Sequence, residues 1–408
     1  MTTGDPAVLT TDTNRPPLSR AARWPFLADL PRLLAAHDRN RPQHHPGLLQ
    51  PDSLFGWDAL NTILGHQHLE PPQLQLAKDG RYLPADTYTR PVTLRPGVTQ
   101  HRIDPAAFYE RLTAGATLVL DAVDHLHPGL HHFAAGLEAQ LRTNVTVSAY
   151  ASIQPDPSFG QHWDDHAVLV LQLAGTKRWT IHGPTLPNPT AATRSLAPRP
   201  DGDEELDLTL RPGDALYVPR GWWHLVSASN GPSLHLTCGL TPHTGLDLIT
   251  WLASDPDLSA LRADLPAAGD QDTADYLQAL HTQLGEALRD PAVVRRFTAA
   301  ADRAAPVRTA LSLPHIVPSI PLDPATPVTL LATRLRTNIT PTGQTQLHAN
   351  GIGYEPPALL VRIIEPLKKR DSATIAELAD AAQIPLARTA QLTALLIRQG
   401  LVALADQP

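Results

Sequence analysis

The stretch 158-SFGQHWDDHAVLVLQLAGTKRWTIH-182 decides the fold, and 213-GDALYVPRGWWH-224 completes it further along the chain. Short apolar segments separated by glycine turns, with no helix between them, predict antiparallel strands. Alternate side chains of a strand share one face, so we expect His162 and Asp164 to point the same way. A second strand folded back beside the first would bring His224 to the same point.

These three residues form a candidate metal site. Two imidazoles and one carboxylate on one face of a metal leave coordination positions open, which is typical of non-haem Fe(II) oxygenases. Zinc more often binds cysteine or a third histidine. An H-x-D pair alone is weak evidence in a chain with 19 histidines, so the prediction depends on the combination of His162, Asp164 and His224.

Lys177 adds a second kind of group to this region. It begins the next predicted strand, 177-KRWTIH-182, directly after a Gly-Thr turn, and its neighbours suggest a barrel wall. A lysine that faces the inside of a barrel is costly unless it meets an anion. We therefore expect an acidic cosubstrate beside Lys177.

The motifs resemble those of a known family. The residues with the spacing of the second cupin motif are Gly213, Asp214, Pro219, Gly221 and His224. The segments 162-HWD-164 and 175-GTKRW-179 resemble the JmjC branch of the 2-oxoglutarate oxygenases. Tyr150, 162-HWDDHAVLVLQLAG-175 and 233-SLHLTCGL-240 look like the ribosomal oxygenase subgroup, whose members hydroxylate side chains of ribosomal proteins.

The resemblance implies a cofactor and its ligands. It implies that His162, Asp164 and His224 bind Fe(II), and that 2-oxoglutarate and O2 occupy the remaining positions. It further implies that Lys177 holds the distal carboxylate of 2-oxoglutarate with help from Tyr150.

Three more residues are expected near the metal or the substrate. Ser148 stands where many eukaryotic family members have asparagine. His166 falls on the metal's side if the strand alternation continues past Asp164. Trp222 and its neighbour Trp223 are candidates for the pocket wall, although core packing explains at least one of them equally well.

We therefore expect a 2-oxoglutarate-dependent dioxygenase that hydroxylates a protein or peptide side chain, with ribosomal proteins the first substrate class to test. One alternative is a hydroxylase of a biosynthetic precursor peptide. Another is a metal-dependent cupin that does not use 2-oxoglutarate, and a third is a DNA-binding regulator. Lysine demethylation is chemically open, but nothing in the sequence selects it.

Composition limits the class of protein. The 408 residues are 42% hydrophobic and 18% charged, as in a globular protein of two or three domains. A formal charge of −7 gives no general attraction to nucleic acid. The single cysteine excludes disulfide scaffolds, and we expect Cys238 to be a small buried residue. We see no signal peptide and no apolar run long enough to span a membrane, and we expect a cytoplasmic protein.

The predicted fold class is α+β, with four regions along the chain. Residues 1–20 are expected to be disordered, and 21–245 to form a double-stranded β-helix, the jelly-roll or cupin fold, as the catalytic domain. Residues 246–310 carry helical spacing and are expected to form a helical domain. The resemblance implies that this domain mediates dimerisation, so a homodimer is expected, and a plain structural subdomain is the alternative. Residues 311–408 are expected to be a linker and a C-terminal winged-helix domain.

The winged-helix prediction has its own details. Helices are expected at 356–369, 372–383 and 387–400, with a strand at 401–406 and an earlier strand at 328–336. The helix after Ser372 lacks a proper capping box counted from that residue. The last helix carries only Arg388 and Arg398, so we do not expect DNA binding.

Overall fold

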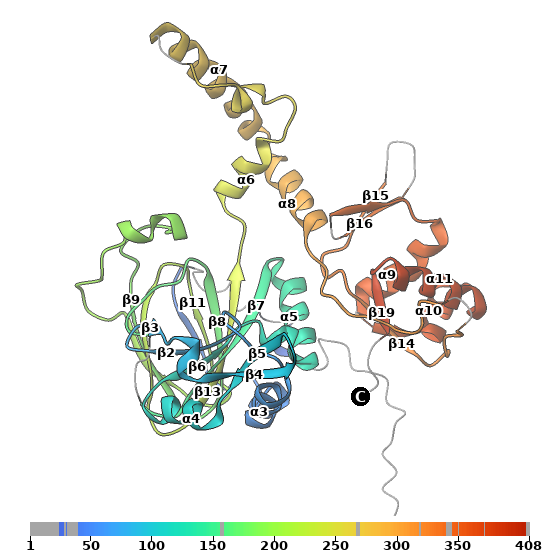
Figure 1. Ribbon diagram of the computed structural model, residues 1–408. Helices are drawn as coiled ribbons and strands as arrows, with labels where there is room; N and C mark the ends of the chain where they lie inside the picture. Colours follow the sequence, from blue (N-terminus) through green and yellow to red (C-terminus); the bar gives the residue numbers. More distant parts are fainter. Residues whose placement is uncertain are drawn as a thin grey trace, which may run out of the picture. The chain divides into compact units, whose positions relative to one another are not determined.

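The computed structural model of the protein describes residues 24–27, 30, 40–155, 159–266, 270–317, 320–339, 345–349, 351–370 and 372–404 (Figure 1). The segment 1–20, expected to be disordered, lies outside these residues. The chain divides into two compact units, one spanning Trp24–Thr250 and the other built on Trp251–Pro408. The finer division at residues 245 and 310 stays a prediction. Among the described helices, none has the length and apolar character needed to cross a bilayer.

The first unit contains the predicted jelly roll, which is made of two antiparallel sheets (Figure 1). The larger sheet has the strand order β1-β11-β8-β13-β7-β6-β2-β3, and the smaller one has the order β10-β9-β12. The bounds are β1 (Gln43–His45), β2 (Leu74–Lys78), β3 (Arg81–Tyr82), β6 (Thr117–Leu120), β7 (Asn144–Ser152), β8 (Ala167–Ala174), β9 (Lys177–His182), β10 (Leu206–Leu210), β11 (Ala215–Val218), β12 (Trp223–Ala228) and β13 (Ser233–Thr241). A separate hairpin joins β4 (Thr89–Arg95) to β5 (Val98–Ile103), and the helices are α3 (Trp57–His66), α4 (Pro105–Thr113) and α5 (Pro128–Leu141).

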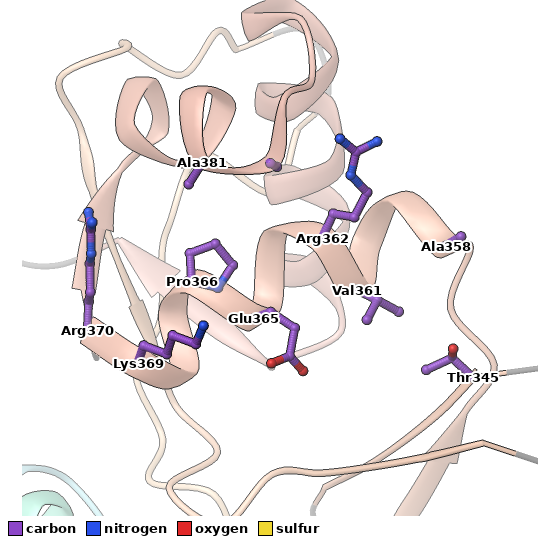
Figure 2. A pocket seen from close by; sticks show the side chains of 10 residues that line it. Thr345, Ala358, Val361, Arg362, Glu365, Pro366, Lys369, Arg370 and Ala381 are labelled. Atoms are coloured by element: carbon purple, nitrogen blue, oxygen red, sulfur yellow. The ribbon is translucent and has the colours of Figure 1, made fainter.

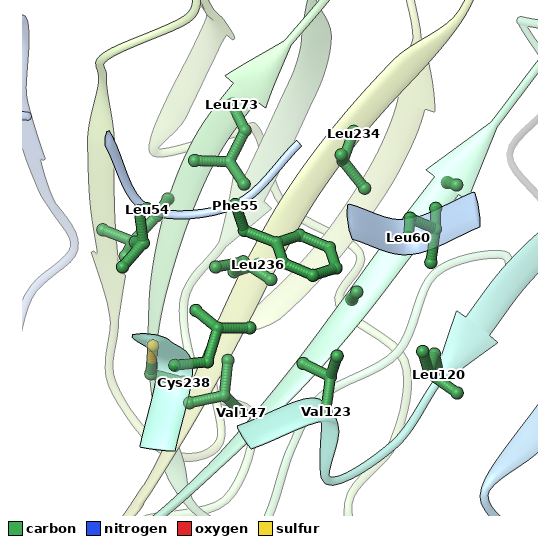
Figure 3. Packing of buried hydrophobic residues seen from close by; sticks show 14 of the residues in the cluster. Leu54, Phe55, Leu60, Leu120, Val123, Val147, Leu173, Leu234, Leu236 and Cys238 are labelled. Atoms are coloured by element: carbon green, nitrogen blue, oxygen red, sulfur yellow. The ribbon is translucent and has the colours of Figure 1, made fainter. Parts of the chain in front are cut away.

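Strands β7 and β13 separate the large core from the barrel interior. They pair along their length, and successive side chains point to opposite faces of the sheet. One set of side chains, which includes Val147, Leu236 and Cys238, packs in the large core with residues such as Leu54 and Phe55 (Figure 3). The alternate positions carry polar and aromatic side chains, which therefore face the barrel interior. Cys238 is fully buried, as predicted.

A second, smaller apolar cluster fills the space between the two sheets. Its buried members are Val168, Val170, Trp179, Ile181, Leu210, Leu216, Val218 and Trp222. Strand β8 contributes to both clusters, because Leu169 and Leu171 belong to the large core. A strand buried on both faces needs apolar side chains at nearly every position, which explains the run 167-AVLVLQLA-174, in which Gln172 is the one polar residue.

The second unit is mainly helical, with two small sheets. Its helices are α7 (Asp270–Arg289), α8 (Val293–Ala304), α9 (Ala358–Arg370), α10 (Ile375–Ala382) and α11 (Leu386–Arg398), and α6 (Gly245–Leu252) lies at the boundary of the units. One sheet has the order β18-β14-β19, from Ser372–Thr374, Pro327–Leu330 and Val402–Leu404. The other joins β15 (Arg336–Ile339), β16 (Thr345–Ala349) and β17 (Ile352–Tyr354).

Two expectations for this unit are wrong. The strand expected at 328–336 ends at Leu330, and the chain enters a second sheet at Arg336 that we did not expect. Strands of three to five residues are too short for their alternation to be recognised with certainty. Helix α10 does have a capping box, in which Thr374 is the N-cap and Glu377 bonds back to its amide, because Ser372 belongs to β18.

We predict a cost for filling the turn that leads into β9. Gly175 has a φ of +61°, and a Cβ there would overlap the carbonyl oxygen of Pro232. Gly231 has a similar φ of +71° with no atom within 4 Å of the added Cβ. A left-handed backbone costs a residue with a Cβ about 1–2 kcal/mol. We expect Gly231→Ala to lose about that much, and Gly175→Ala clearly more, in the free energy of unfolding measured with urea.

Equal losses in the two variants would contradict the close approach of Gly175 to Pro232.

Candidate metal centre

Two hydrogen bonds join the stretches that carry the predicted metal ligands. The amide of His162 donates to the carbonyl of His224 over 3.0 Å, and the amide of His224 donates back over 2.7 Å. The two imidazole rings lie 4.3 Å apart, centroid to centroid. Asp164 Oδ2 is 3.6 Å from His224 Nε2. One ligand atom from each residue fits within 4.8 Å of the other two, so the structure brings the three predicted residues together.

The local backbone differs from the continuous strand that we expected. Strand β8 begins only at Ala167, and His162 is held by an isolated bridge. The amide of Gly221 donates to the carbonyl of Asp164 over 2.9 Å and so holds the backbone of Asp164 in place. Trp163 is buried beneath the guanidinium of Arg194, which lies 4.5 Å from the ring centroid.

The alternation that placed His166 on the metal's side therefore does not apply. His166 Nδ1 lies 3.0 Å from Asp165 Oδ1, and its ring is close to Gly239. It is not among the residues that line the pocket at the ligands. Its role beside the metal or the substrate stays a prediction.

Backbone carbonyls set the tautomer of both histidine ligands. His162 Nδ1 lies 3.0 Å from the carbonyl oxygen of Gly160, and His224 Nδ1 lies 3.1 Å from that of Trp222. A carbonyl only accepts hydrogen bonds, so each Nδ1 carries the proton and each Nε2 keeps its lone pair. This is the arrangement in which a histidine binds a metal through Nε2.

Burial also favours the neutral form of His224. Desolvation, followed by the neighbouring His162, lowers its pKa to about 4. A histidine binds a metal as the neutral imidazole. His224 is already neutral near pH 7, so it does not have to release a proton when a metal binds. The donor set therefore fits a divalent metal ion.

A small pocket of about 80 Å³ opens beside the three ligands. Its lining residues are Thr117, Tyr150, Ser152, Phe159, His162, Asp164, Val168, Lys177, Trp179, His224, Val226, Ala228, His235 and Thr237. Lys177 is only 3% exposed, and no carboxylate in the described part of the chain pairs with it. Desolvation lowers its pKa to about 7. A buried ammonium group without a counter-ion indicates a place for an anion.

Sequence reasoning missed two polar groups in this pocket. His235 is 4% exposed and stacks on Tyr150 with the ring centroids 4.9 Å apart. Within the described residues its Nδ1 has no hydrogen-bond partner, and neither has Trp179 Nε1. Burial, followed by the nearby Lys177, lowers the pKa of His235 well below its usual value. The alternation of β13 carried the signal, because His235 lies on the face opposite to Leu234 and Leu236 and pairs with Tyr150.

The remaining predicted residues lie close to the pocket without lining it. Trp222 contributes its carbonyl to His224, while its side chain packs in the smaller apolar cluster. Trp223 Nε1 donates to Thr185 Oγ1 over 3.0 Å. The tryptophan that lines the pocket is Trp179; Trp222 and Trp223 do not line it. Ser148 Oγ donates to Asp121 Oδ1 over 2.9 Å.

A larger hollow of about 660 Å³ lies within the second unit, between β16, α9 and α10 (Figure 2). Arg362, Glu365, Lys369 and Arg370 line it together with small and apolar residues. It contains no histidine or cysteine. Within the described residues, His162, Asp164 and His224 are the only group of three histidine, cysteine, aspartate or glutamate side chains close enough to hold one metal ion.

Parts of the chain are similar to a known domain family and to several known proteins. Residues 127–248 match the family model of the JmjC domain. The chain is 38% identical over 94 residues to the bifunctional lysine-specific demethylase and histidyl-hydroxylase NO66 of Drosophila persimilis, covering 23% of this chain and 14% of that protein. It is 34% identical over 164 residues to ribosomal oxygenase 1 of Rattus norvegicus, covering 39% of this chain and 27% of that protein. The chain thus spans less than a third of the length of these relatives.

A solved structure shares the fold. The ribosomal oxygenase YcfD of Escherichia coli matches 92% of this chain and 98% of its own, with a TM-score of 0.55 and 19% sequence identity. The same protein has been solved in complex with cobalt and 2-oxoglutarate. At this identity the likeness establishes the jelly-roll fold.

The buried Lys177 gives a pH prediction for the metal-free protein. Its pKa is about 7 in the folded state, against 10.5 for a solvent-exposed lysine, as in the unfolded chain. Between these values the unfolded chain holds a proton that the folded one lacks, so this residue's contribution to stability rises with pH from about 7 to 10.5. We expect the free energy of unfolding of the wild type to rise relative to Lys177→Met across this window. Parallel pH curves for the two proteins would contradict the burial of an unpaired lysine.

Proposed function

We propose that this chain, which contains a JmjC domain over residues 127–248, is an Fe(II)- and 2-oxoglutarate-dependent oxygenase that hydroxylates a side chain of a protein or peptide. One observation carries the proposal. An open metal set of two histidines and one carboxylate shares a small pocket with a buried lysine that has no counter-ion among the described residues.

The charges of the pocket fit this pair of cofactors. A divalent ion and Lys177 together balance Asp164 and a dicarboxylate such as 2-oxoglutarate. Because His224 and His235 are held neutral by burial, no further charge needs a partner. Iron when bound supplies the activation of O2, coupled to decarboxylation of the 2-oxo acid.

The protein's own residues would bind and orient the cosubstrate. Lys177 and Tyr150 would hold its distal carboxylate, since both line the pocket with the metal ligands. Trp179 Nε1 is a buried donor without a partner in the described structure, and a bound acid offers it an acceptor. Desolvation raises the pKa of Tyr150 well above its usual value, so its hydroxyl keeps the proton that it would donate.

Lys177 also separates this proposal from its alternative. A cupin that does not use 2-oxoglutarate has no need of a buried cation facing its metal. The names of the relatives support a protein substrate, and we propose ribosomal proteins as the first class to test. On that basis we place the protein in the cytoplasm. No feature of the pocket favours demethylation or a biosynthetic precursor peptide.

We propose that the helices after the jelly roll form a homodimer. In α7 none of the side chains described from 272 to 289 is buried, and the apolar Leu277 and Leu288 are exposed to solvent. A long helix without a buried face is marginal in water on its own. A second copy of the same helices would cover this face. Sedimentation of a single-chain mass at micromolar concentration would contradict it.

We propose that the C-terminal part is a winged-helix domain with a structural or partner-binding role. Helices α9, α10 and α11 share one hydrophobic core with the sheet β18-β14-β19. The last helix, α11, which would enter a DNA groove, carries only Arg388 and Arg398 as basic residues. DNA binding is therefore not part of the proposal.

The metal ligands give the direct test of the activity. Losing a residue that only orients a metal ligand typically lowers metal affinity by about 10- to 100-fold. Asp164 is itself a proposed ligand, so we expect Asp164→Ala to lower the affinity for Fe(II) by more than this. Turnover of 2-oxoglutarate to succinate should disappear with it. Asp207→Ala is the matched control, because Asp207 pairs with Arg178 on the smaller sheet and lies outside the pocket. Metal content and succinate formation would be measured in the same preparations.

Full turnover in Asp164→Ala, or a wild type that binds iron and turns over no 2-oxoglutarate with any peptide, would overturn the proposed activity.

A further inference from the structure

The hollow of about 660 Å³ in the second unit is built on one face of α9 (Figure 2). Its charged residues Arg362, Glu365 and Lys369 follow one another at spacings of three and four, which places them on a single helix face. The opposite face of α9 is buried in the core of the unit and carries Leu360, Ile363, Ile364 and Leu367. The face at the hollow is therefore not needed to pack the helix.

Positive charge predominates in this hollow. Arg362, Lys369 and Arg370 line it, and none of them forms an ion pair within the described part of the chain. Glu365 is the one carboxylate in the lining, and its Oε1 lies 3.0 Å from Lys368 Nζ. Three positive charges thus remain on a protein whose formal charge is −7. A concave site of this kind attracts anions.

The end of α9 explains only part of this charge. Lys369 and Arg370 lie in the last turn, where the carbonyl groups of the helix stabilise cations. Arg362 lies about two turns earlier, where that effect has fallen away. Its Nη2 donates to the carbonyl of Gln383 over 3.4 Å, which uses one of the five N–H donors of a guanidinium. Most of its donors remain open to a ligand.

The acids of α10 do not neutralise the hollow. Glu377 Oε2 accepts from the amide and the hydroxyl of Thr374, so it serves the helix cap. Neither Glu377 nor Asp380 lines the hollow, and α10 contributes Ala381 and Ala382 instead. The cations of α9 therefore face a wall of small apolar side chains.

This mixture of surfaces favours a peptide over a nucleic acid. Phosphate groups would pair with the cations but gain nothing from Val361 or Ala381, and none of the described lining residues is an aromatic on which a base could stack. A peptide supplies carboxylates and apolar side chains together. Pro366 has no amide, so the carbonyl of Arg362 lacks its helical donor and offers an acceptor to a peptide N–H.

We propose that the hollow between β16, α9 and α10 binds an acidic peptide segment of a partner protein, in which an apolar side chain stands between carboxylates. The apolar side chain would lie against Val361, Pro366 and the alanines of α10. The carboxylates would pair with Arg362 and Lys369, the arginine through two parallel hydrogen bonds. The size of the hollow is within the range of about 300–1,000 Å³ that is typical of ligand sites. The inference goes beyond the proposed oxygenase activity and needs no metal.

The test uses the full chain and short fluorescein-labelled probes, with binding followed by fluorescence anisotropy. The first probe is a peptide with a leucine between two pairs of glutamates. Its comparison peptides have lysines in place of the glutamates, or serine in place of the leucine, and the last probe is a single-stranded RNA of similar length. We expect the glutamate–leucine peptide to bind most tightly, by about tenfold over the serine peptide, because part of the leucine side chain is buried.

Two variants connect the binding to the hollow. Arg362→Glu and Lys369→Glu replace attraction of the peptide by repulsion, and we expect each to weaken its binding by about tenfold. Arg388→Glu is the matched control, because Arg388 lies on α11 outside the hollow and should leave binding unchanged. Since Arg362 also contacts Gln383, unfolding in urea is measured for each variant. Lys369 makes no side-chain hydrogen bond among the described residues, so its variant tests the charge alone.

The inference is overturned if the acidic leucine peptide does not bind, if the serine peptide or the RNA binds as well, or if both hollow variants bind like the wild type. Sedimentation of the same variants tests the remaining occupant. A loss of self-association in Arg362→Glu and Lys369→Glu, but not in Arg388→Glu, would show that the hollow holds a second copy of this chain, which also contradicts the proposed partner.

Discussion

The reciprocal pair of backbone hydrogen bonds between His162 and His224 is the constraint on which the site depends. It joins two stretches that are distant in sequence, and it fixes both imidazoles before any metal arrives. The amide of Gly221 adds a hold on Asp164, and the carbonyls of Gly160 and Trp222 turn the two rings. Ligands that are oriented by the backbone need little rearrangement on binding a metal, which keeps the entropic cost of binding low.

The rest of the first unit supports this bridge and gives the pocket its charges. The alternation of β7 and β13 buries their apolar residues in the large core and leaves tyrosine, histidine and hydroxyl groups inside the barrel. Lys177 enters the pocket from β9. A low-polarity interior strengthens the interaction of each charge with a ligand of opposite sign. The same fold therefore offers Lys177 as a cation for an acidic ligand beside the metal ligands.

The sequence was sufficient for the jelly roll and for the convergence of His162, Asp164 and His224, because turn residues and the spacing of the two motifs are local signals. Strand alternation failed locally, since β8 begins only at Ala167. It was insufficient for His235 and Trp179, whose place in the pocket depends on how β7, β9 and β13 pair across the barrel. The short strands β15 to β17 and the Thr374 cap were missed because single-residue shifts decide where such elements begin.

The most direct measurement is an anaerobic titration of the Fe(II)-loaded protein with 2-oxoglutarate, following the visible charge-transfer absorption that forms when the 2-oxo acid chelates iron. The account predicts a band that saturates in the wild type, and a much weaker affinity in Lys177→Ala at unchanged iron content. Iron bound with no band in the wild type, or equal affinity in the variant, would contradict the assignment of the pocket to 2-oxoglutarate.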